Sequence, residues 1–227
     1  MIKFITHNTR TKNMHFLPFF VLNNNLRKVS LRILSFFFIV FLLVSCKESY
    51  TPKPRGYFRI DFPEKTYAEI TGSYPYKFEI PAYARIEKDK RNLNKPNWIN
   101  VSVPENKVEV HLSYYQLNGK KEARNSLLME LMEETRSLAY KHTIKADAID
   151  ERLFLNPRQK VYGTIYSIEG NAASPMQFFL TDSTNHFLRG AFYIREVPDI
   201  DSLQPVINFF EPDIIHLIET TSWNECH

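Results

Sequence analysis

Histidines and clustered carboxylates are the side chains of this sequence best suited to acid–base or metal chemistry. Beyond residue 45, single histidines stand at five separated positions: His111, His142, His186, His216 and His227. Carboxylates gather in two stretches: Asp147, Asp150 and Glu151, then Glu196, Asp199 and Asp201. No histidine stands at metal-ligand spacing from a second ligand, and neither carboxylate group has the full calcium-loop pattern. We therefore expect no metal site, no catalytic residue and no cofactor, and we assign the carboxylates to loops and helix ends.

Cys46 is the residue whose surroundings indicate a chemical modification. It follows small Ser45 and an apolar run, "ILSFFFIVFLLV", at 33–44. As a helix this run would span about 18 Å, well short of the roughly 30 Å hydrocarbon core of a bilayer. Three basic residues precede it between positions 27 and 32. This arrangement is typical of a signal peptide rather than of a membrane span.

The four residues "LVSC" at 43–46 resemble the lipobox of bacterial lipoproteins. The resemblance implies cleavage before Cys46, a diacylglyceryl group on its sulfur and acylation of the new amino terminus. Two or three acyl chains anchor a protein stably, whereas one chain does so only marginally. A signal anchor that ends in cysteine and an ordinary signal peptide are the alternatives. We expect residues 1–45 to be a lipoprotein-type signal peptide, and their length indicates a translation start later than Met1.

The charge distribution argues against nucleic acid as a partner. The formal net charge is +4, but residues 1–45 hold six basic and no acidic residues, which leaves 23 basic against 25 acidic residues beyond them. The part beyond the leader is therefore slightly negative, unlike a phosphate-binding surface. With six glycines and no phosphate loop, dinucleotide pattern or nucleophile elbow, the sequence offers no enzyme signature.

A proline-containing strip, "CKESYTPKPRG" at 46–56, separates the cysteine from the rest. We interpret it as a lipidated tether in extended geometry and residues 57–227 as a single domain. At the junction, Arg55, Tyr57, Phe58 and Arg59 form an aromatic-basic block. The block is either an edge strand that docks the tether onto the core or a partner-binding site.

Alternating apolar residues predict strands in the first half of the domain. Within residues 57–70, the apolar residues Phe58, Ile60 and Phe62 alternate with polar ones, which predicts a strand ended by Pro63. Residues 76–80 repeat the alternation. Residues 99–103 and 108–112 alternate on both sides of Glu105 and Asn106, which predicts a β-hairpin.

Two segments have helical periodicity. The first predicted helix spans about 119–142, with Asn118 as its N-cap and an apolar stripe made of Ala123, Leu127, Leu128, Leu131, Met132 and Leu138. The second lies near the end, with one face made of Leu203, Ile207, Phe210, Ile214 and Leu217. Asp201 is its expected cap, Pro205 is acceptable in the first turn, and Pro212 should kink or restart it.

Four short strands are predicted between the two helices, at about 148–156, 159–170, 175–183 and 186–196. Their regular spacing favours an antiparallel meander. The predicted class is α+β: an antiparallel sheet with one central and one C-terminal helix packed on it, similar in architecture to Mog1/PsbP-type proteins.

Three stretches together resemble GldD, a family of gliding-motility lipoproteins of Bacteroidota. They are "YTPKPRGYFRIDFPEKTY" at 50–67, "YPYKFEIPAYARI" at 74–86 and "HLIETTSW" at 216–223. The resemblance implies a cell-envelope lipoprotein required for gliding and linked to type IX secretion of surface adhesins. It also implies other Gld proteins, of GldE and GldJ type, as partners. Only Cys46 carries over as a site residue, for lipid attachment.

We therefore expect a non-enzymatic scaffold or assembly factor that faces the periplasm, on a membrane that the sequence does not specify. The alternative is a small-ligand-binding or enzymatic envelope lipoprotein. A deep polar pocket with convergent ionisable groups would favour the alternative, whereas a broad exposed surface would favour the scaffold.

Overall fold

The computed structural model describes residues 28–29, 32–36, 38, 62–196 and 199–224. The chain divides into two units, residues 1–56 and residues 57–227. In the first unit, residues 32–36 of the predicted signal peptide are helical. Among the described residues, no helix combines the length and the apolar character needed to cross a membrane.

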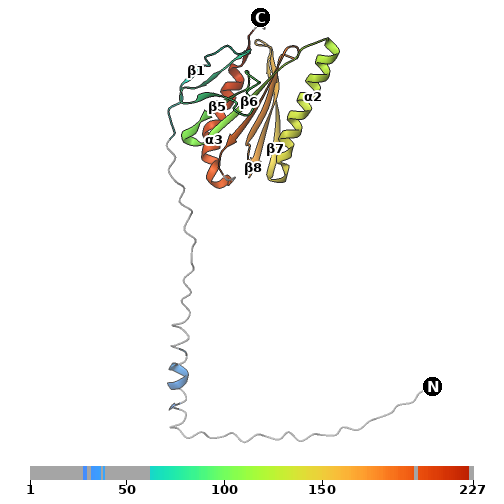
Figure 1. Ribbon diagram of the computed structural model, residues 1–227. Helices are drawn as coiled ribbons and strands as arrows, with labels where there is room; N and C mark the ends of the chain where they lie inside the picture. The colour runs from blue at the N-terminus through green and yellow to red at the C-terminus, as the bar shows by residue number, and fades with distance from the viewer. Residues whose placement is uncertain (1–27, 30–31, 37, 39–61, 197–198, 225–227) are drawn as a thin grey trace, which may run out of the picture. The chain divides into compact units, whose positions relative to one another are not determined.

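An antiparallel sheet forms the centre of the second unit (Figure 1). Within the described residues it has seven strands, in the order β4 (Arg85–Lys88), β5 (Ile99–Val103), β6 (Val108–Gln116), β10 (His186–Ile194), β9 (Met176–Thr181), β8 (Val161–Gly170) and β7 (Ala146–Asn156). The 3-10 helix η1 (Pro104–Asn106) joins β5 to β6, so the predicted hairpin is confirmed. The four strands of the predicted meander are confirmed as β7, β8, β9 and β10.

Helices α2 (Lys121–Tyr140) and α3 (Ile200–Thr220) pack on opposite faces of this sheet (Figure 1). Successive residues of a strand point to opposite faces, and Phe178 and Phe179 of β9 accordingly lie in two different apolar clusters. Phe178 shares its cluster with Phe210 of α3, and Phe179 shares the other with Leu131 of α2. The predicted α+β class, with one central and one C-terminal helix on an antiparallel sheet, is confirmed.

A segment before the sheet, residues 62–84, is called the strap below. It contains β1 (Tyr67–Glu69), which pairs with β3 (Glu79–Pro81), and β2 (Tyr76–Lys77), which pairs with β11 (Ser222–Trp223) near the end of the chain. A further 3-10 helix, η2 (Lys141–Ile144), follows α2. The alternation at Tyr76, Phe78 and Ile80 is confirmed, since all three side chains are buried.

The first predicted strand, which ends at Pro63, lies outside the described residues except for Phe62. Residues 62–66 are not in a strand. Strand β1 begins only at Tyr67, after Pro63, which has no N–H to donate to a neighbouring strand.

Both predicted helix caps are wrong. The N-cap of α2 is Lys120 rather than Asn118, and that of α3 is Asp199 rather than Asp201. Neither cap residue makes a side-chain hydrogen bond to its helix. Packing of each apolar face against the sheet, rather than a local cap, therefore sets where these helices begin.

The prolines of α3 do not interrupt it. The helix starts at Ile200, so Pro205 lies in its second turn, and the helix continues through Pro212. Proline costs a helix interior about 3 kcal/mol, and burial of five large apolar side chains on the opposite face outweighs that cost. The predicted restart at Pro212 is wrong.

The buried stripe of α2 differs from the predicted one. Its buried residues are Leu131, Thr135 and Ala139, whereas Met132 is 38% exposed. The Thr135 hydroxyl donates to the Leu131 carbonyl at 2.7 Å, so it can be buried without losing a hydrogen bond.

Candidate functional site

The residues predicted to carry function lie outside the described part of the chain. They are Cys46, the predicted lipidation site, and Arg55, Tyr57, Phe58 and Arg59, the candidate partner-binding block. The described part of the domain begins at Phe62, three residues after Arg59. We therefore build the site from the strap that follows the block and from the polar groups that the fold brings together.

The start of the strap docks on α3. The Phe62 ring stacks on Phe209 with centroids 4.1 Å apart and meets Phe210 edge-on at 6.3 Å. Three residues later, the Lys65 ammonium donates to the Phe209 carbonyl at 2.5 Å and lies over the Phe209 ring. The chain thus enters the domain through a fixed contact with a core helix.

Asp213 of α3 is the polar centre of this contact. Its side chain is 5% exposed and accepts hydrogen bonds from Lys65 at 2.8 Å, from the Tyr67 hydroxyl at 2.7 Å and from the Tyr83 hydroxyl. The three donors all belong to the strap. A buried carboxylate is stable only when it is paired, and here the strap supplies every one of these partners.

The tyrosines of this centre remain neutral donors. Burial, together with the hydrogen bond to Asp213, raises the pKa of Tyr67 to about 12. The same two causes, burial first, raise the pKa of Tyr83 far above its ordinary value. Both hydroxyls therefore keep their protons at physiological pH, which suits a structural latch and not proton transfer.

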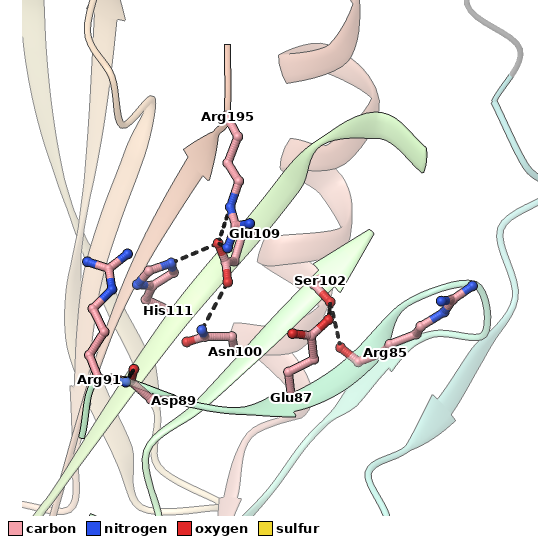
Figure 2. Close-up of polar contacts among 9 residues, drawn as sticks. All are labelled: Arg85, Glu87, Asp89, Arg91, Asn100, Ser102, Glu109, His111 and Arg195. Carbon is pink, nitrogen blue, oxygen red and sulfur yellow. Dashed lines mark hydrogen bonds and ion pairs between the residues drawn. The ribbon is translucent and has the colours of Figure 1, made fainter. Parts of the chain in front are cut away.

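A second polar group lies on the sheet face opposite α3. We call it the open sheet face, and it consists of Arg85, Glu87, Asn100, Ser102, Glu109 and His111 from β4, β5 and β6, with Tyr193 and Arg195 in and after β10. Strand alternation places these side chains opposite the apolar ones that face α3. Figure 2 shows all of them except Tyr193, in two neighbouring groups around Glu109 and around Glu87, although they come from segments far apart in the sequence.

Glu109 is the centre of the open sheet face. Its side chain is 4% exposed and contacts Asn100 Nδ2 at 2.9 Å, His111 Nε2 at 3.1 Å and Arg195 Nε at 2.6 Å (Figure 2). Burial alone would raise the pKa of Glu109, but hydrogen bonds and positive charge from His111 and Arg195 outweigh it and lower that pKa. The carboxylate is therefore held ionised beneath an arginine that is 65% exposed.

The network continues towards the edge of the sheet. The Ser102 hydroxyl donates to Glu87 at 2.9 Å, and exposed Arg85 pairs with Glu105 at 3.0 Å. Beyond β4, the Asp89 carboxylate accepts from Asn92, and this hydrogen bond is the main cause of its lowered pKa. The open sheet face is thus a broad, internally paired polar surface with two exposed arginines.

A cleft lies elsewhere, beside the N-terminal half of α3. It has a volume of about 450 Å³ and a partly apolar lining that includes Met176, Phe192 and Ile207. Asp147, Glu169 and Glu211 supply carboxylates to its wall. No group of three or more His, Cys, Asp or Glu side chains within the described residues is arranged to hold a metal ion.

Sequence reasoning did not identify Asp213 or Glu109 as central residues. A signal existed for Asp213, since it stands three residues after Phe210 and four before Leu217, on the buried stripe of α3. For Glu109 the strand alternation indicated only an outward position. Its partner Arg195 is 86 residues away in the sequence, so their hydrogen bond could not be read from the local pattern.

Comparisons with known proteins give a family and a distant fold likeness. No curated protein sequence matches the chain. The chain is similar to the solution structure of cyanobacterial PsbP from Synechocystis sp. PCC 6803, at 10% identity, with 76% of this chain and 99% of that chain covered. The TM-score of 0.43 is too low for that likeness to carry an argument. The family model described as gliding motility lipoprotein GldD matches residues 47–223.

That match covers most of the chain and includes the strap, Asp213 and the open sheet face. The chain therefore belongs to the GldD family of gliding motility lipoproteins, membrane-anchored proteins of the cell envelope.

Proposed function

We propose that this gliding motility lipoprotein is a non-enzymatic assembly factor. In this proposal the lipid on Cys46 holds the domain at a membrane facing the periplasm. There the domain binds and stabilises envelope proteins of gliding and of type IX secretion, of which proteins of GldE and GldJ type are the expected partners.

The junction between tether and domain supports a positioning role. An extended tether of eleven residues would reach about 30 Å from the bilayer. The strap then joins α3 through the Phe62–Phe209 stack and the three donors on Asp213. Because this junction is anchored in the core, the tether limits the distance between the membrane and the surfaces that the domain presents.

The open sheet face is the observation that carries the proposal. It extends over four adjacent strands, its buried carboxylate is satisfied internally, and its exposed groups include Arg85 and Arg195. Arginine is enriched in protein interfaces, and paired polar groups can be covered by a partner without being left unsatisfied. The exposed arginines and internally paired polar groups of this face are chemistry that suits a macromolecular partner.

Site-specific photocrosslinking in intact cells tests the proposal. A photoreactive phenylalanine analogue is placed at Tyr193, in the open sheet face, and separately at Phe58, in the aromatic-basic block. The matched control carries the analogue at Asn125, which is exposed on α2. Mass spectrometry should identify gliding or type IX secretion proteins crosslinked to Tyr193 or Phe58, and fewer or none crosslinked to Asn125.

Recovery of no envelope protein from either position would contradict the assembly role. Crosslinks at Tyr193 and Asn125 that were identical in partner and yield would also contradict the assembly role. The open sheet face would then bind envelope proteins no better than the control surface on α2.

The cleft beside α3 supports a second candidate function, the binding of a small envelope ligand. Its volume of about 450 Å³ lies within the range of ligand pockets, and it combines an apolar lining with carboxylates. A ligand that binds the purified lipoprotein, and whose binding is lost in Phe192→Trp, would favour this candidate. Unchanged ligand binding in that variant would argue against the cleft.

A further inference from the structure

β7 is the outermost strand of the sheet, and in the described part of the chain no strand pairs with its outer edge. It is eleven residues long, whereas the strand at the other edge, β4, has four residues. An unpaired strand edge presents a row of backbone N–H and C=O groups that can pair with another strand.

The two halves of β7 differ in their protection against such pairing. The first half carries Asp147, Asp150, Glu151 and Arg152, and a register irregularity lies between Ala146 and Ala148. Charges and bulges of this kind normally block strand addition. The second half has an apolar sequence, Leu-Phe-Leu at 153–155.

The apolar half of β7 is exposed to solvent, although large apolar side chains in a sheet are usually buried. Leu153 is 74% exposed and Leu155 is 67% exposed, and both point to the sheet face that carries α2. Phe154 points to the other face and packs in part against the core. An edge with this composition is a site for β-strand addition.

We propose that a second copy of this chain occupies the edge, with two β7 strands pairing antiparallel about a two-fold axis at Phe154. This inference is independent of the assembly role. In this register Phe154 faces its own copy, Leu153 faces Leu155 of the other chain, and the two sheets continue into one.

The sequence of β7 is complementary to itself in this register. Leu-Phe-Leu reads the same in both directions, so antiparallel pairing matches apolar side chains on both faces of the sheet. The acidic half of one strand then runs alongside the turn that follows the other strand. That turn carries Arg158 and Lys160, so Asp150 is directed towards Arg158 of the second copy.

Other two-fold registers are less favourable. Moving the axis by two residues to Arg152 places two arginines opposite each other and sets Glu151 against Leu153. Moving the axis to Glu151 opposes two glutamates. Like charges directly opposite in a sheet are destabilising, so the axis at Phe154 is preferred.

Disulfide crosslinking of the full-length lipoprotein in membranes tests both the partner and the register. Directly opposite residues of an antiparallel pair have Cβ atoms about 4.5–5.5 Å apart, close enough for a disulfide after small adjustments. Phe154→Cys, in a Cys226→Ser background that keeps Cys46, should therefore form a disulfide-linked homodimer under mild oxidation.

The matched controls are Arg152→Cys and Asn156→Cys. In the proposed register each lies about 13 Å along the strand from its own copy, which is too far for a disulfide. Alone, each should give no more dimer than the Cys226→Ser parent. Mixed in one membrane, they should crosslink to each other, because residue 152 of one chain faces residue 156 of the other.

A further pair of changes separates loss of pairing from loss of folding. Leu153→Lys with Leu155→Lys alters two exposed side chains, so the circular dichroism spectrum and melting temperature should be retained. Added to Phe154→Cys, this pair should abolish the crosslinked dimer. Equal crosslinking of Phe154→Cys and Arg152→Cys, or capture of a different protein in place of a second copy, would overturn the proposal.

Discussion

Asp213 shows how one carboxylate can hold two distant segments together. Asp213→Asn keeps the shape of the side chain but removes its charge, and because its NH₂ group replaces one of the two accepting oxygens, either Tyr67 or Tyr83 loses its acceptor. A buried donor left without an acceptor costs about 1–3 kcal/mol, so we expect the free energy of unfolding to fall by this amount. Urea denaturation of the purified protein measures it.

The matched control for this change is Asp201→Asn, which alters an exposed carboxylate in the first turn of the same helix. Its free energy of unfolding should stay within about 0.5 kcal/mol of the wild type. Equal effects of the two substitutions would mean that the strap donors do not stabilise the fold.

His186 predicts a dependence of stability on pH. Burial is the main cause of its lowered pKa, although Asp182 acts in the opposite direction, and its ordinary value is 6.5. The unfolded chain then binds the proton more readily than the folded one. The contribution of neutral His186 to the free energy of unfolding is therefore complete above pH 6.5 and is lost as the pH falls through the folded pKa. We expect the melting temperature to decrease from pH 7.5 to pH 5, and His186→Gln to flatten this decrease.

His142 is the comparison for this prediction, because burial lowers its pKa too. His142→Gln should therefore also reduce the decrease in melting temperature between pH 7.5 and pH 5, independently of His186→Gln. A wild-type melting temperature that is constant between pH 7.5 and pH 5 would contradict the assignment of both histidines.

At the scale of the element, α3 contains a proline in its interior, Pro212, which weakens the helix rather than ending it. Pro212 is exposed and has no N–H to donate to the carbonyl of Asn208. Pro212→Ala restores this donor and removes a steric clash. The free energy gained in the helix exceeds the entropic cost of ordering an unfolded chain that is more flexible without proline. We expect the free energy of unfolding to rise by about 1–2 kcal/mol, as measured by urea denaturation. A lower stability in this variant would mean that the proline shapes the packing of α3.

The strap is a second element whose role can be isolated. Phe62→Ala removes the stack on Phe209 and should lower the free energy of unfolding by about 1–2 kcal/mol, because the ring is only half-buried. Hydrogen exchange should become faster at β1 while remaining slow at β9 in the core. Glu64→Ala, at an exposed position of the same strap, should leave both exchange rates unchanged.

At the scale of the whole molecule, the anchor and the fold should be separable. Cys46→Ser removes the predicted lipid site, and the domain should still fold because the described contacts of the strap and the core are made among residues 62–224. The variant should leave the membrane fraction or keep its leader, and cells should not spread on a surface. Cell fractionation and a spreading assay measure these effects.

Cys226→Ser is the matched control, since we predict no modification of the second cysteine. It should behave as the wild type in both assays. Motile cells with Cys46→Ser protein free of the membrane would contradict the requirement for a lipid anchor.

Much of the fold could be read from the sequence because periodicity is a local property. Alternation at residues 99–112 indicated the hairpin, and the 3.6-residue period indicated both helices, the first of them with nearly the correct length. The exact ends could not be read, because neither Lys120 nor Asp199 caps its helix with its own side chain, and the first N–H of α3 donates to the distant Asn171 side chain instead. Their positions depend on where the sheet supports each helix.

By itself, the sequence determined the class of the fold, the setting of Cys46 and the family, since these depend on neighbouring residues or on whole motifs. Only the tertiary structure decided which polar groups meet. Asp213 binds side chains 130 to 148 residues away, and Glu109 accepts a hydrogen bond from Arg195, which follows another strand. The physical reason is that a period along the chain shows which face is buried, whereas a hydrogen bond also requires the distant partner, whose position is set by packing and strand register.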